Sequence, residues 1–316
     1  MKNFTSVNDV SNLSELVKKA QEMKARPQAF NPLGQGKVLT LLFFNPSLRT
    51  RLSTQRAGFN LGMQVISMNA DQGWKLEFED QVVMNGDKAE HIREAAAVVS
   101  QYADIIGIRT FPSLTDREKD YADVVINKFI EFASVPIISL ESAIRHPLQS
   151  LADLLTIEEF KKRDQPKIVL SWAPHPRALP QAVANSFAEW VQAAGYDLTI
   201  THPKGYELAR TFAVKAKITH HQEEAFAGAD FIYTKNWSTF QPYGQALPIQ
   251  EDWTITPEKM ALTNQAFFMH CLPVRRNVVV TDQVLDSAQS IVIAQANNRT
   301  YAAQAVIAEL LNNKEP

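Results

Sequence analysis

Short apolar segments alternate with segments of helical periodicity along almost the whole chain. An apolar run at 38–44 precedes a helical segment at 52–61, and a second run at 104–110 precedes one at 121–134. Parallel strands need long crossover connections, which helices usually supply, so this alternation predicts parallel sheets with helices on both faces. We therefore expect an α/β fold. Further strands are expected at 64–68, 135–140, 167–172, 197–201, 230–234, 266–269 and 290–294, and a last helix at 301–311.

The length of the chain favours two such domains. It has 316 residues, and single domains commonly hold about 100–150. We expect the first domain to span 1–146 and the second 147–299, with a C-terminal helix at 300–316 packing back on the first. The helix that starts at Pro147 is expected to join them.

The segment Phe43-Phe44-Asn45-Pro46-Ser47-Leu48-Arg49-Thr50-Arg51 lies at a strand-to-helix turn. Ser47 is a residue type that often caps a helix N-terminus. Unpaired backbone N–H groups at a helix start favour an anion, and Arg49, Thr50 and Arg51 add two cations and a hydroxyl. The pattern predicts a phosphate site without a glycine-rich loop. The alternative is a capped surface helix with solvated arginines.

More polar residues follow the ends of predicted strands. Arg109 ends one strand, Glu141 ends another, and His146-Pro147-Leu148-Gln149 begins the next helix. Ligands of open α/β sheets bind at the carboxyl ends of the strands. We expect Arg109 to add a phosphate contact, and His146 and Gln149 to face outward at the same edge. An isolated histidine is more often structural.

Two loops carry unusual residues. Trp172-Ala173-Pro174-His175-Pro176-Arg177-Ala178-Leu179-Pro180 has three prolines, which make it stiff; it either spans a gap or forms a rigid wall for a substrate. The polar segment 71–77 carries Trp74, which is either a local packing anchor or a ligand contact.

Composition and charge argue against several classes of protein. A net charge of −2 lacks the excess of positive charge that is typical of proteins that bind nucleic acid. No apolar run approaches the ~20 residues that span a bilayer. The single cysteine, Cys271, cannot form an internal disulfide, and the start of the chain lacks an apolar signal core. No His, Cys and Asp cluster has metal-ligand spacing. A cytoplasmic protein without metal, nucleic-acid or membrane partners is expected.

Three motifs in register resemble one family. Ser47-Leu48-Arg49-Thr50-Arg51, His146-Pro147-Leu148-Gln149 and His270-Cys271-Leu272-Pro273 occur in the order and spacing of the aspartate/ornithine carbamoyltransferases. The resemblance covers essentially the whole chain. It implies carbamoyl transfer without a cofactor, two doubly wound parallel-sheet domains joined by interdomain helices, and a homotrimer with sites at subunit interfaces. The first domain would bind carbamoyl phosphate.

Two departures point to a subgroup of that family. The Ser-Met-Gly loop of ordinary ornithine enzymes is missing, and Lys235-Asn236-Trp237 stands in its place. This resembles the enzymes that carbamoylate N-acetyl- or N-succinyl-L-ornithine in arginine biosynthesis, which also have a trefoil knot at the proline-rich loop. An acylated α-nitrogen needs no Asp, while the α-carboxylate still needs a cation.

The acyl group is predicted from two positions. In the acetyl enzymes, Glu stands two before His91 and Asn follows the Leu of the proline-rich loop; succinyl enzymes have Pro at both. Here the residues are Ala89 and Pro180. Ala89 would not repel a succinyl carboxylate as Glu would. We expect N-succinyl-L-ornithine, with N-acetyl-L-ornithine as the alternative.

The resemblance also implies roles for individual residues. Phosphate would be bound by Ser47, Leu48, Arg49, Thr50, Arg109 and Arg299, the last from the second domain. His146, with Arg49 and Thr50, would polarise the carbonyl oxygen. Gln149 and the Leu272 carbonyl would orient the carbamoyl amide. The acylornithine would be bound by Trp74, Ala89, Glu141, His175, Pro180, Lys235, Cys271, Leu272 and Arg275, with the loop of Trp74 reaching into a neighbouring subunit.

Other functions stay open from the sequence. One is carbamoylation of free ornithine or another amine such as putrescine, although Lys235 argues against an amine without a carboxylate. Another is a non-catalytic relative that binds anions or partner subunits.

Overall fold

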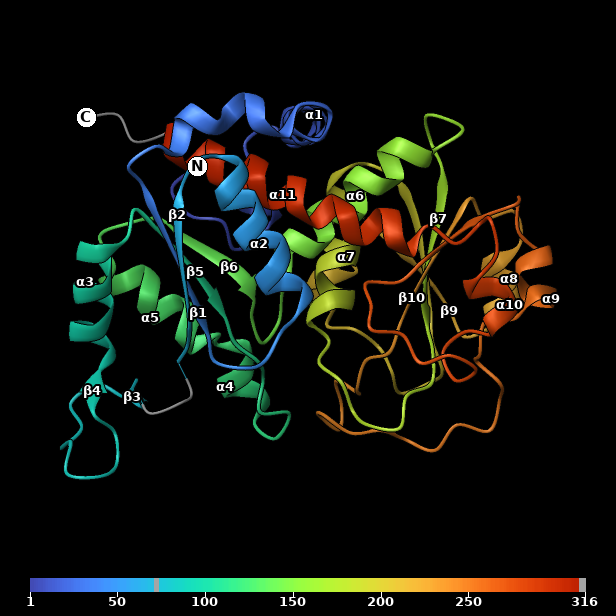
Figure 1. Ribbon diagram of the computed structural model, residues 1–316. Helices are drawn as coiled ribbons and strands as arrows, with labels where there is room; N and C mark the ends of the chain where they lie inside the picture. The colour runs from blue at the N-terminus through green and yellow to red at the C-terminus, as the bar shows by residue number, and fades with distance from the viewer. Residues whose placement is uncertain (71–73, 313–316) are drawn as a thin grey trace. The chain divides into compact units, whose positions relative to one another are not determined.

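Two parallel sheets form the framework of the chain in the computed structural model (Figure 1). The structure describes residues 1–70 and 74–312. Two compact units are distinguished, and each is described separately. Unit 1 comprises 1–113, 118–148 and 299–316, and unit 2 comprises 114–117 and 149–298.

The described helices and strands follow one another as the sequence alternation predicts. From the N-terminus they are η1 (Val7–Asp9), α1 (Leu13–Ala25), η2 (Pro27–Gly34), β1 (Val38–Phe43), α2 (Arg49–Asn60), β2 (Gln64–Asn69), β3 (Leu76–Glu77), β4 (Glu90–His91), α3 (Ile92–Tyr102), β5 (Ile105–Arg109), α4 (Arg117–Tyr121), α5 (Val124–Phe132) and β6 (Ile137–Glu141). They continue with α6 (Pro147–Phe160), β7 (Lys167–Trp172), α7 (Ala182–Ala193), β8 (Asp197–Thr201), η3 (Arg210–Phe212), β9 (Lys217–Thr219), α8 (Gln222–Phe226), β10 (Phe231–Lys235), α9 (Pro257–Ala261), β11 (Phe267–Met269), α10 (Asp282–Leu285) and α11 (Val292–Asn312).

The sheet of unit 1 has the strand order β2-β1-β5-β6, and all of its pairings are parallel. Residues of α3 and α5 pack on one face, where Ala96 and Phe129 join a buried cluster with Ile106 and Ile108 of β5. Figure 1 shows α2 on the other side of this sheet. Because β5 is covered on both faces, all five of its residues are buried, including the terminal Arg109.

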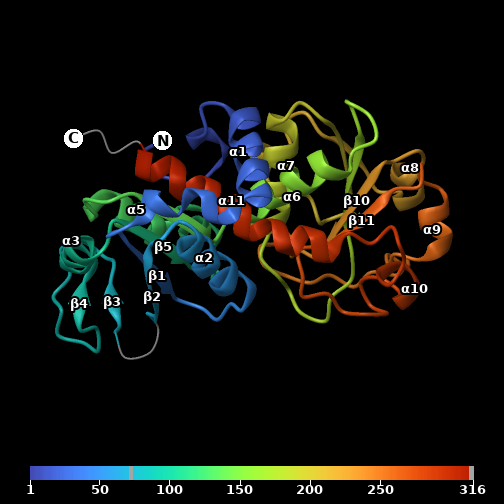
Figure 2. The same ribbon diagram turned by 45° about the horizontal axis from the view of Figure 1, so that its top comes forward.

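The last helix belongs partly to unit 1. Within that unit, Lys19 of α1 forms a 2.7 Å ion pair with Glu309 of α11, and Asn60 of α2 donates to Gln304 at 3.0 Å. Figure 2 shows α1 and α11 side by side. These contacts bring the C-terminal half of α11 back to the N-terminal helices.

The sheet of unit 2 has the order β11-β10-β7-β8-β9, also parallel throughout. Strand β7 shows how it is covered. Ile168 and Leu170 face a core built with α7, whereas Val169 faces a second core built with α8. Period-two alternation of this kind puts apolar residues on both faces, which confirms the expected α/β class with two parallel-sheet units.

Two sequence predictions about elements are wrong. The run at 290–294 is not a strand: Ser290 makes one bridge to Phe268, and helix α11 begins at Val292. A short apolar run fits a buried helix start as well as a strand, which explains the error. The helix expected at 121–134 is broken, because Asp123 adopts a left-handed conformation with φ +48° and α5 starts after it. In the described part of the chain, no helix is long and apolar enough to cross a bilayer.

Gly62, which connects α2 to β2, provides a test of this packing. Its φ is +81°, and an added Cβ would lie 2.3 Å from the backbone oxygen of Asn31. We expect Gly62→Ala to lower the free energy of unfolding by roughly 2 kcal/mol or more, measured by urea denaturation.

Two other glycines separate the causes of that loss. Gly36 has φ +74° with nothing near its Cβ position, so Gly36→Ala should cost only about 1 kcal/mol of backbone strain. Gly86 has neither constraint, and Gly86→Ala should be nearly neutral. Equal losses for all three variants would contradict the close packing at Gly62.

Candidate functional site

Helix α2 begins without a side-chain cap. The sequence predicts Ser47 as the N-cap, and this is wrong: α2 starts at Arg49, and Leu48 holds the cap position without a side-chain hydrogen bond from any described residue. The first turn also contains no acidic residue. The N–H groups of this turn therefore keep their capacity to bind an anion.

The hydroxyl of Thr50 is contacted by two guanidinium groups. Thr50 is buried, and its Oγ1 accepts hydrogen bonds from Arg299 Nη2 at 2.6 Å and from Arg109 Nη1 at 3.3 Å. Arg299 was expected in the second domain, but it lies in unit 1 with Thr50. The start of α2, the end of β5 and the start of the unit 1 part of α11 thus bring their polar groups to one place.

A buried carboxylate holds two of the expected site residues. Glu141, at the end of β6, forms an ion pair with Arg109 and lies 3.4 Å from His146 Nε2 through the same oxygen. The register of β5 and β6 shifts between Ile108 and Arg109, so that Arg109 is paired with Glu141. An irregularity of this kind re-aims a side chain at the end of a strand. The Nε of Arg109 is buried and has no hydrogen-bond partner among the described residues.

Arg51 does not belong to this group. Its guanidinium donates to Ser67 at 2.5 Å and to Asn69, both on β2, and it lies 4.1 Å above the ring of Phe43. The second arginine of the motif therefore ties α2 to the sheet.

In unit 2, a buried carboxylate that the sequence analysis missed orients two amides. Asp153 Oδ1 accepts 2.7 Å hydrogen bonds from Gln149 Nε2, one turn earlier on α6, and from Gln295 Nε2 on α11. With both amide nitrogens bound there, the oxygen of each amide points elsewhere. Gln295 Oε1 accepts from the backbone N–H of His270 at 2.9 Å, whereas Gln149 Oε1 is buried without a partner among the described residues.

His146 and Gln149 are not outward-facing as expected. They are 4% and 0% exposed, respectively. The i, i+4 spacing of Gln149 and Asp153 was the signal for this network. The same spacing does not reveal Gln295, because the sequence predicts a strand at 290–294, whereas Gln295 lies on helix α11.

The segment after β11 continues the Asp153 network. The N–H of Leu272 donates to Nδ1 of His270 at 2.9 Å, and Leu272 has a φ of +52°. Cys271 lies between them and is half-buried. Burial raises the pKa of the Tyr233 phenol well above its usual value, and the nearby Asp153 and Cys271 add to this shift. Cys271 therefore lies near a phenol whose pKa is raised.

A second group of unit 2 residues is strongly basic. Arg275 Nε donates to His175 Nε2 at 3.0 Å, although the two are far apart in the sequence. Burial lowers the pKa of His175, and the positive charges of Lys235, Arg275 and Arg177 lower it further. The hydrogen bond with the Arg177 carbonyl raises this pKa but does not cancel the shift. We call these four residues the basic cluster. It suits an anionic group on a ligand.

The proline-rich loop is attached to the segment that follows β10. Asn236 donates to the backbone oxygen of Ala173 at 2.7 Å, and the N–H of Ser238 donates to that of Leu179 at 2.8 Å. Between them, Trp237 is buried and donates to the Tyr206 carbonyl at 2.8 Å. Pro180, half-buried, ends this loop just before α7.

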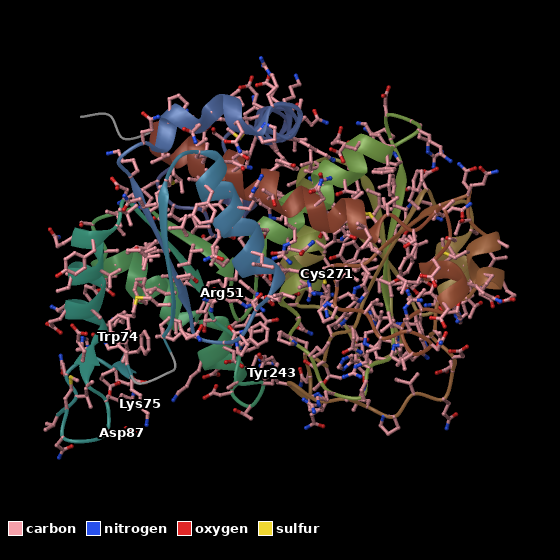
Figure 3. All side chains as sticks on the ribbon, in the orientation of Figure 1. Arg51, Trp74, Lys75, Asp87, Tyr243 and Cys271 are labelled. Atoms are coloured by element: carbon pink, nitrogen blue, oxygen red, sulfur yellow. The ribbon has the colours of Figure 1, made fainter. Side chains whose placement is uncertain are left out.

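Trp74 and Ala89 lie on a separate part of unit 1. Trp74 is half-buried, and its indole N–H donates to Glu90 Oε2 at 2.7 Å, so it has a packing role within the chain. Ala89 is exposed just before β4, and its N–H donates to the Lys75 carbonyl at 3.0 Å. Figure 3 shows Trp74, Lys75 and Asp87 near β3 and β4. Asp71, Gln72 and Gly73 of the expected polar loop lie outside the described residues.

Comparison with protein families assigns both parts of the chain. Residues 2–159 match the aspartate/ornithine carbamoyltransferase carbamoyl-P binding domain, and residues 180–310 match the Asp/Orn binding domain of the same family.

The relatives extend over the full length. N-succinylornithine carbamoyltransferase of Bacteroides thetaiotaomicron is 52% identical, with 100% of both chains covered, and that of Bacteroides fragilis is 53% identical, with 99% of each covered. N-acetylornithine carbamoyltransferase of Xanthomonas campestris is 38% identical, with 90% of this chain and 91% of the relative covered.

A solved structure, acetylornithine transcarbamylase complexed with acetylcitrulline, superimposes with a TM-score of 0.91 at 36% identity, covering 98% of this chain and 99% of that one.

The pKa of His175 tests the basic cluster. Removing a neighbouring cation makes protonation easier, so Arg275→Gln should raise the pKa of His175 toward its ordinary value, measured by NMR titration of the imidazole C–H signals. Arg276→Gln is the matched control, because Arg276 forms its ion pairs with Asp282 and Asp286 instead. An unchanged pKa in Arg275→Gln would contradict the cluster.

Proposed function

The chain belongs to the aspartate/ornithine carbamoyltransferase family, and from that premise we propose that it carbamoylates N-succinyl-L-ornithine. The products would be N-succinyl-L-citrulline and phosphate, in arginine biosynthesis. The observation that carries the proposal is identity of 52–53% over the full length to two N-succinylornithine carbamoyltransferases. N-acetyl-L-ornithine is the second candidate, because N-acetylornithine carbamoyltransferases are also relatives, at 36–38%.

The reaction exchanges one bond for another. The neutral δ-amine attacks the carbonyl carbon of carbamoyl phosphate, a C–N bond forms, and the bond from that carbon to the phosphate oxygen breaks. Phosphate leaves with the electron pair of that bond and takes up the proton that the amine nitrogen loses. No cofactor takes part, so the rate depends on orientation and on stabilisation of the charge that develops on oxygen.

The anion would be bound at the start of α2. Ser47 and Leu48 offer backbone N–H groups, and Arg49, Arg109 and Arg299 offer positive charge. Thr50 accepts from two of these arginines, so its hydroxyl hydrogen is directed away from them and can reach a phosphate or carbonyl oxygen. His146 is positioned by Glu141 and would polarise the carbonyl oxygen as it gains negative charge.

The carbamoyl amide would be oriented by acceptors. Asp153 binds the amide nitrogen of Gln149, which leaves the Gln149 oxygen as the acceptor for an NH₂ group. The backbone oxygen of Leu272 would be the second acceptor. Cys271 would contact the δ-amine without attacking the carbonyl.

The basic cluster favours an acyl group that carries a carboxylate. N-succinyl-L-ornithine has two carboxylates and N-acetyl-L-ornithine has one, and Lys235 with Arg177 and Arg275 offers more positive charge than a single α-carboxylate needs. Two further residues also favour the succinyl substrate: Ala89, which is small and uncharged, and Pro180. Solved mutants of N-acetyl-L-ornithine transcarbamylase that lack one glutamate are complexed with N-succinyl-L-norvaline.

Trp74 and Ala89 would complete the acylornithine site. Glu141 would contribute indirectly, because it positions Arg109 and His146. We place Trp74 and Ala89 in the site of a neighbouring subunit of a homotrimer. The loop between β3 and β4 supports this, because Val82, Val83 and Met84 at its tip are exposed.

Further family features are proposed for the whole chain. Residues 1–146 with 299–316 would form the carbamoyl phosphate domain and 147–298 the acylornithine domain, with Arg299 in the first because it lies in unit 1. A trefoil knot at the proline-rich loop is proposed from the resemblance to the acylornithine enzymes. The proposed location is the cytoplasm.

Arg49→Ala tests the phosphate site. Loss of a charged hydrogen-bond donor should weaken binding of inorganic phosphate by roughly 10- to 100-fold in isothermal titration calorimetry. Arg51→Ala is the control two residues away. It should lower thermal stability, because Arg51 ties α2 to β2, and leave phosphate affinity nearly unchanged. Unchanged binding in Arg49→Ala would overturn the assignment.

Ala89→Glu tests the acyl specificity. A carboxylate there should repel the succinyl group and lower the ratio of kcat/KM for the succinyl over the acetyl substrate about fivefold, as expected for roughly 1 kcal/mol between partly solvated charges. Ala89→Gln adds similar bulk without charge and should change the ratio less. Equal shifts in both variants would mean that size, not charge, acts at this position.

The experiment that tests the function directly measures product formation from carbamoyl phosphate with ornithine, N-acetyl-L-ornithine and N-succinyl-L-ornithine side by side. Preference for the succinyl compound is expected. Preference for the acetyl compound would refute the role of the basic cluster, and turnover of free ornithine alone would refute an acylated substrate. Binding of carbamoyl phosphate without turnover would indicate a non-catalytic relative.

A further inference from the structure

The carboxyl ends of β8 and β9 bring together three side chains that carbamoyl transfer does not use. His202, Glu207 and His220 each offer one metal-ligand atom, and these atoms all lie within 4.8 Å of one another. From this geometry we propose that unit 2 binds one divalent transition metal ion, with Zn²⁺ as the favoured ion, through the imidazoles of His202 and His220 and the carboxylate of Glu207.

The sheet explains why the two histidines meet. Strands β8 and β9 are parallel neighbours, with Thr201 paired to Thr219, and each is followed directly by a histidine. The backbone N–H of His202 donates to the Thr219 carbonyl at 3.3 Å, which extends the pairing by one residue. The rings lie with centroids 5.1 Å apart at 75°. The repeated Thr-His at two strand ends was the sequence signal, and spacing alone did not reveal it.

The hydrogen bonds of both rings leave the same nitrogen for a metal. His202 Nδ1 lies 2.8 Å from the Pro203 carbonyl, and His220 Nδ1 lies 2.9 Å from the His202 carbonyl. A carbonyl only accepts, so each Nδ1 carries the hydrogen and each Nε2 keeps its lone pair. Metal-binding histidines are commonly held in this way, by a backbone carbonyl on the other ring nitrogen.

Glu207 is exposed but lies on a fixed turn. Its Oε1 accepts from the Gly205 N–H at 3.2 Å. The preceding residue, Tyr206, accepts from Trp237 Nε1 through its carbonyl and contacts Leu247 through its hydroxyl at 2.7 Å. The backbone that carries the carboxylate is thus attached to two other segments, whereas the side chain can still rotate toward the histidines.

The donor set selects the class of ion. Two imidazoles and one carboxylate form a set typical of three-ligand zinc sites, in which water takes the fourth position. Zinc bonds of about 2.0–2.1 Å place tetrahedral ligands ~3.4 Å apart, so small rotations would close the present spacing. Ca²⁺ and Mg²⁺ prefer oxygen ligands and should bind poorly here.

Binding would fix the 202–220 connection. That connection holds Tyr206, whose carbonyl binds Trp237, the residue that follows Lys235-Asn236. The ion would therefore stabilise the backbone behind Lys235. Its presence does not depend on which amine the enzyme carbamoylates.

The test uses the full-length, untagged chain after dialysis against a chelator. Co²⁺ serves as the spectroscopic probe, and Zn²⁺ is measured by competition with a chromophoric chelator and by thermal unfolding. We expect one ion per chain, visible Co²⁺ absorption bands typical of a site with nitrogen ligands, and a rise in the unfolding temperature with Zn²⁺. Mg²⁺ should give no such rise.

Variants assign the signal to these residues. His220→Ala and Glu207→Gln should each lower Zn²⁺ affinity by at least tenfold. His221→Ala is the matched control, because His221 is exposed and adjacent to His220 but outside the cluster. Absence of one-to-one binding at about 0.1 mM Zn²⁺ would overturn the proposal. So would equal affinity in wild type, His220→Ala and Glu207→Gln, since the ion would then bind elsewhere.

Discussion

The buried ion pair between Arg109 and Glu141 is the interaction on which the site in unit 1 depends. Two charges removed from water are tolerated only when each finds its partner, and loss of one would leave the other uncompensated. The register shift at the end of β5 supplies this match by pairing Arg109 with Glu141. Through that pair, His146 gains a fixed neighbour, and Arg109 reaches the hydroxyl of Thr50. The ends of β5 and β6 thus fix Arg109 and Glu141 relative to each other.

In unit 2, hydrogen bonds to a buried carboxylate fix the orientation of two amide side chains. Asp153 is fully buried, yet it accepts from Gln149 and Gln295 on different helices and so determines which way each amide faces. An amide that could flip would present either a donor or an acceptor to a ligand. Holding the nitrogen leaves only the oxygen available, which is the group that a carbamoyl NH₂ requires.

The sequence could predict those parts of the fold and site that follow from local periodicity and from family motifs. Strand ends at Arg109 and Glu141 were found because each closes a buried apolar run. Asp153 was missed, although its spacing from Gln149 was visible, because a buried carboxylate is recognised only when its partners are known. Gln295 and the meeting of His202 with His220 depend on which strands and helices become neighbours. Ser47 shows where local sequence preference misleads. It is a good capping residue, but helix α2 starts two positions after it, at Arg49, and Leu48 holds the cap position.

The uneven placement of charge has a consequence for how the protein meets its substrates. The chain as a whole is slightly acidic, with a net charge of −2, although arginines and a lysine gather at the proposed phosphate site and in the basic cluster. The remaining surface must then carry a larger negative charge than the net value suggests. Ion exchange would report this acidic exterior, whereas a multiply charged anion approaching the site would be attracted. Its capture should therefore slow as ionic strength rises, even though the protein is close to neutral overall.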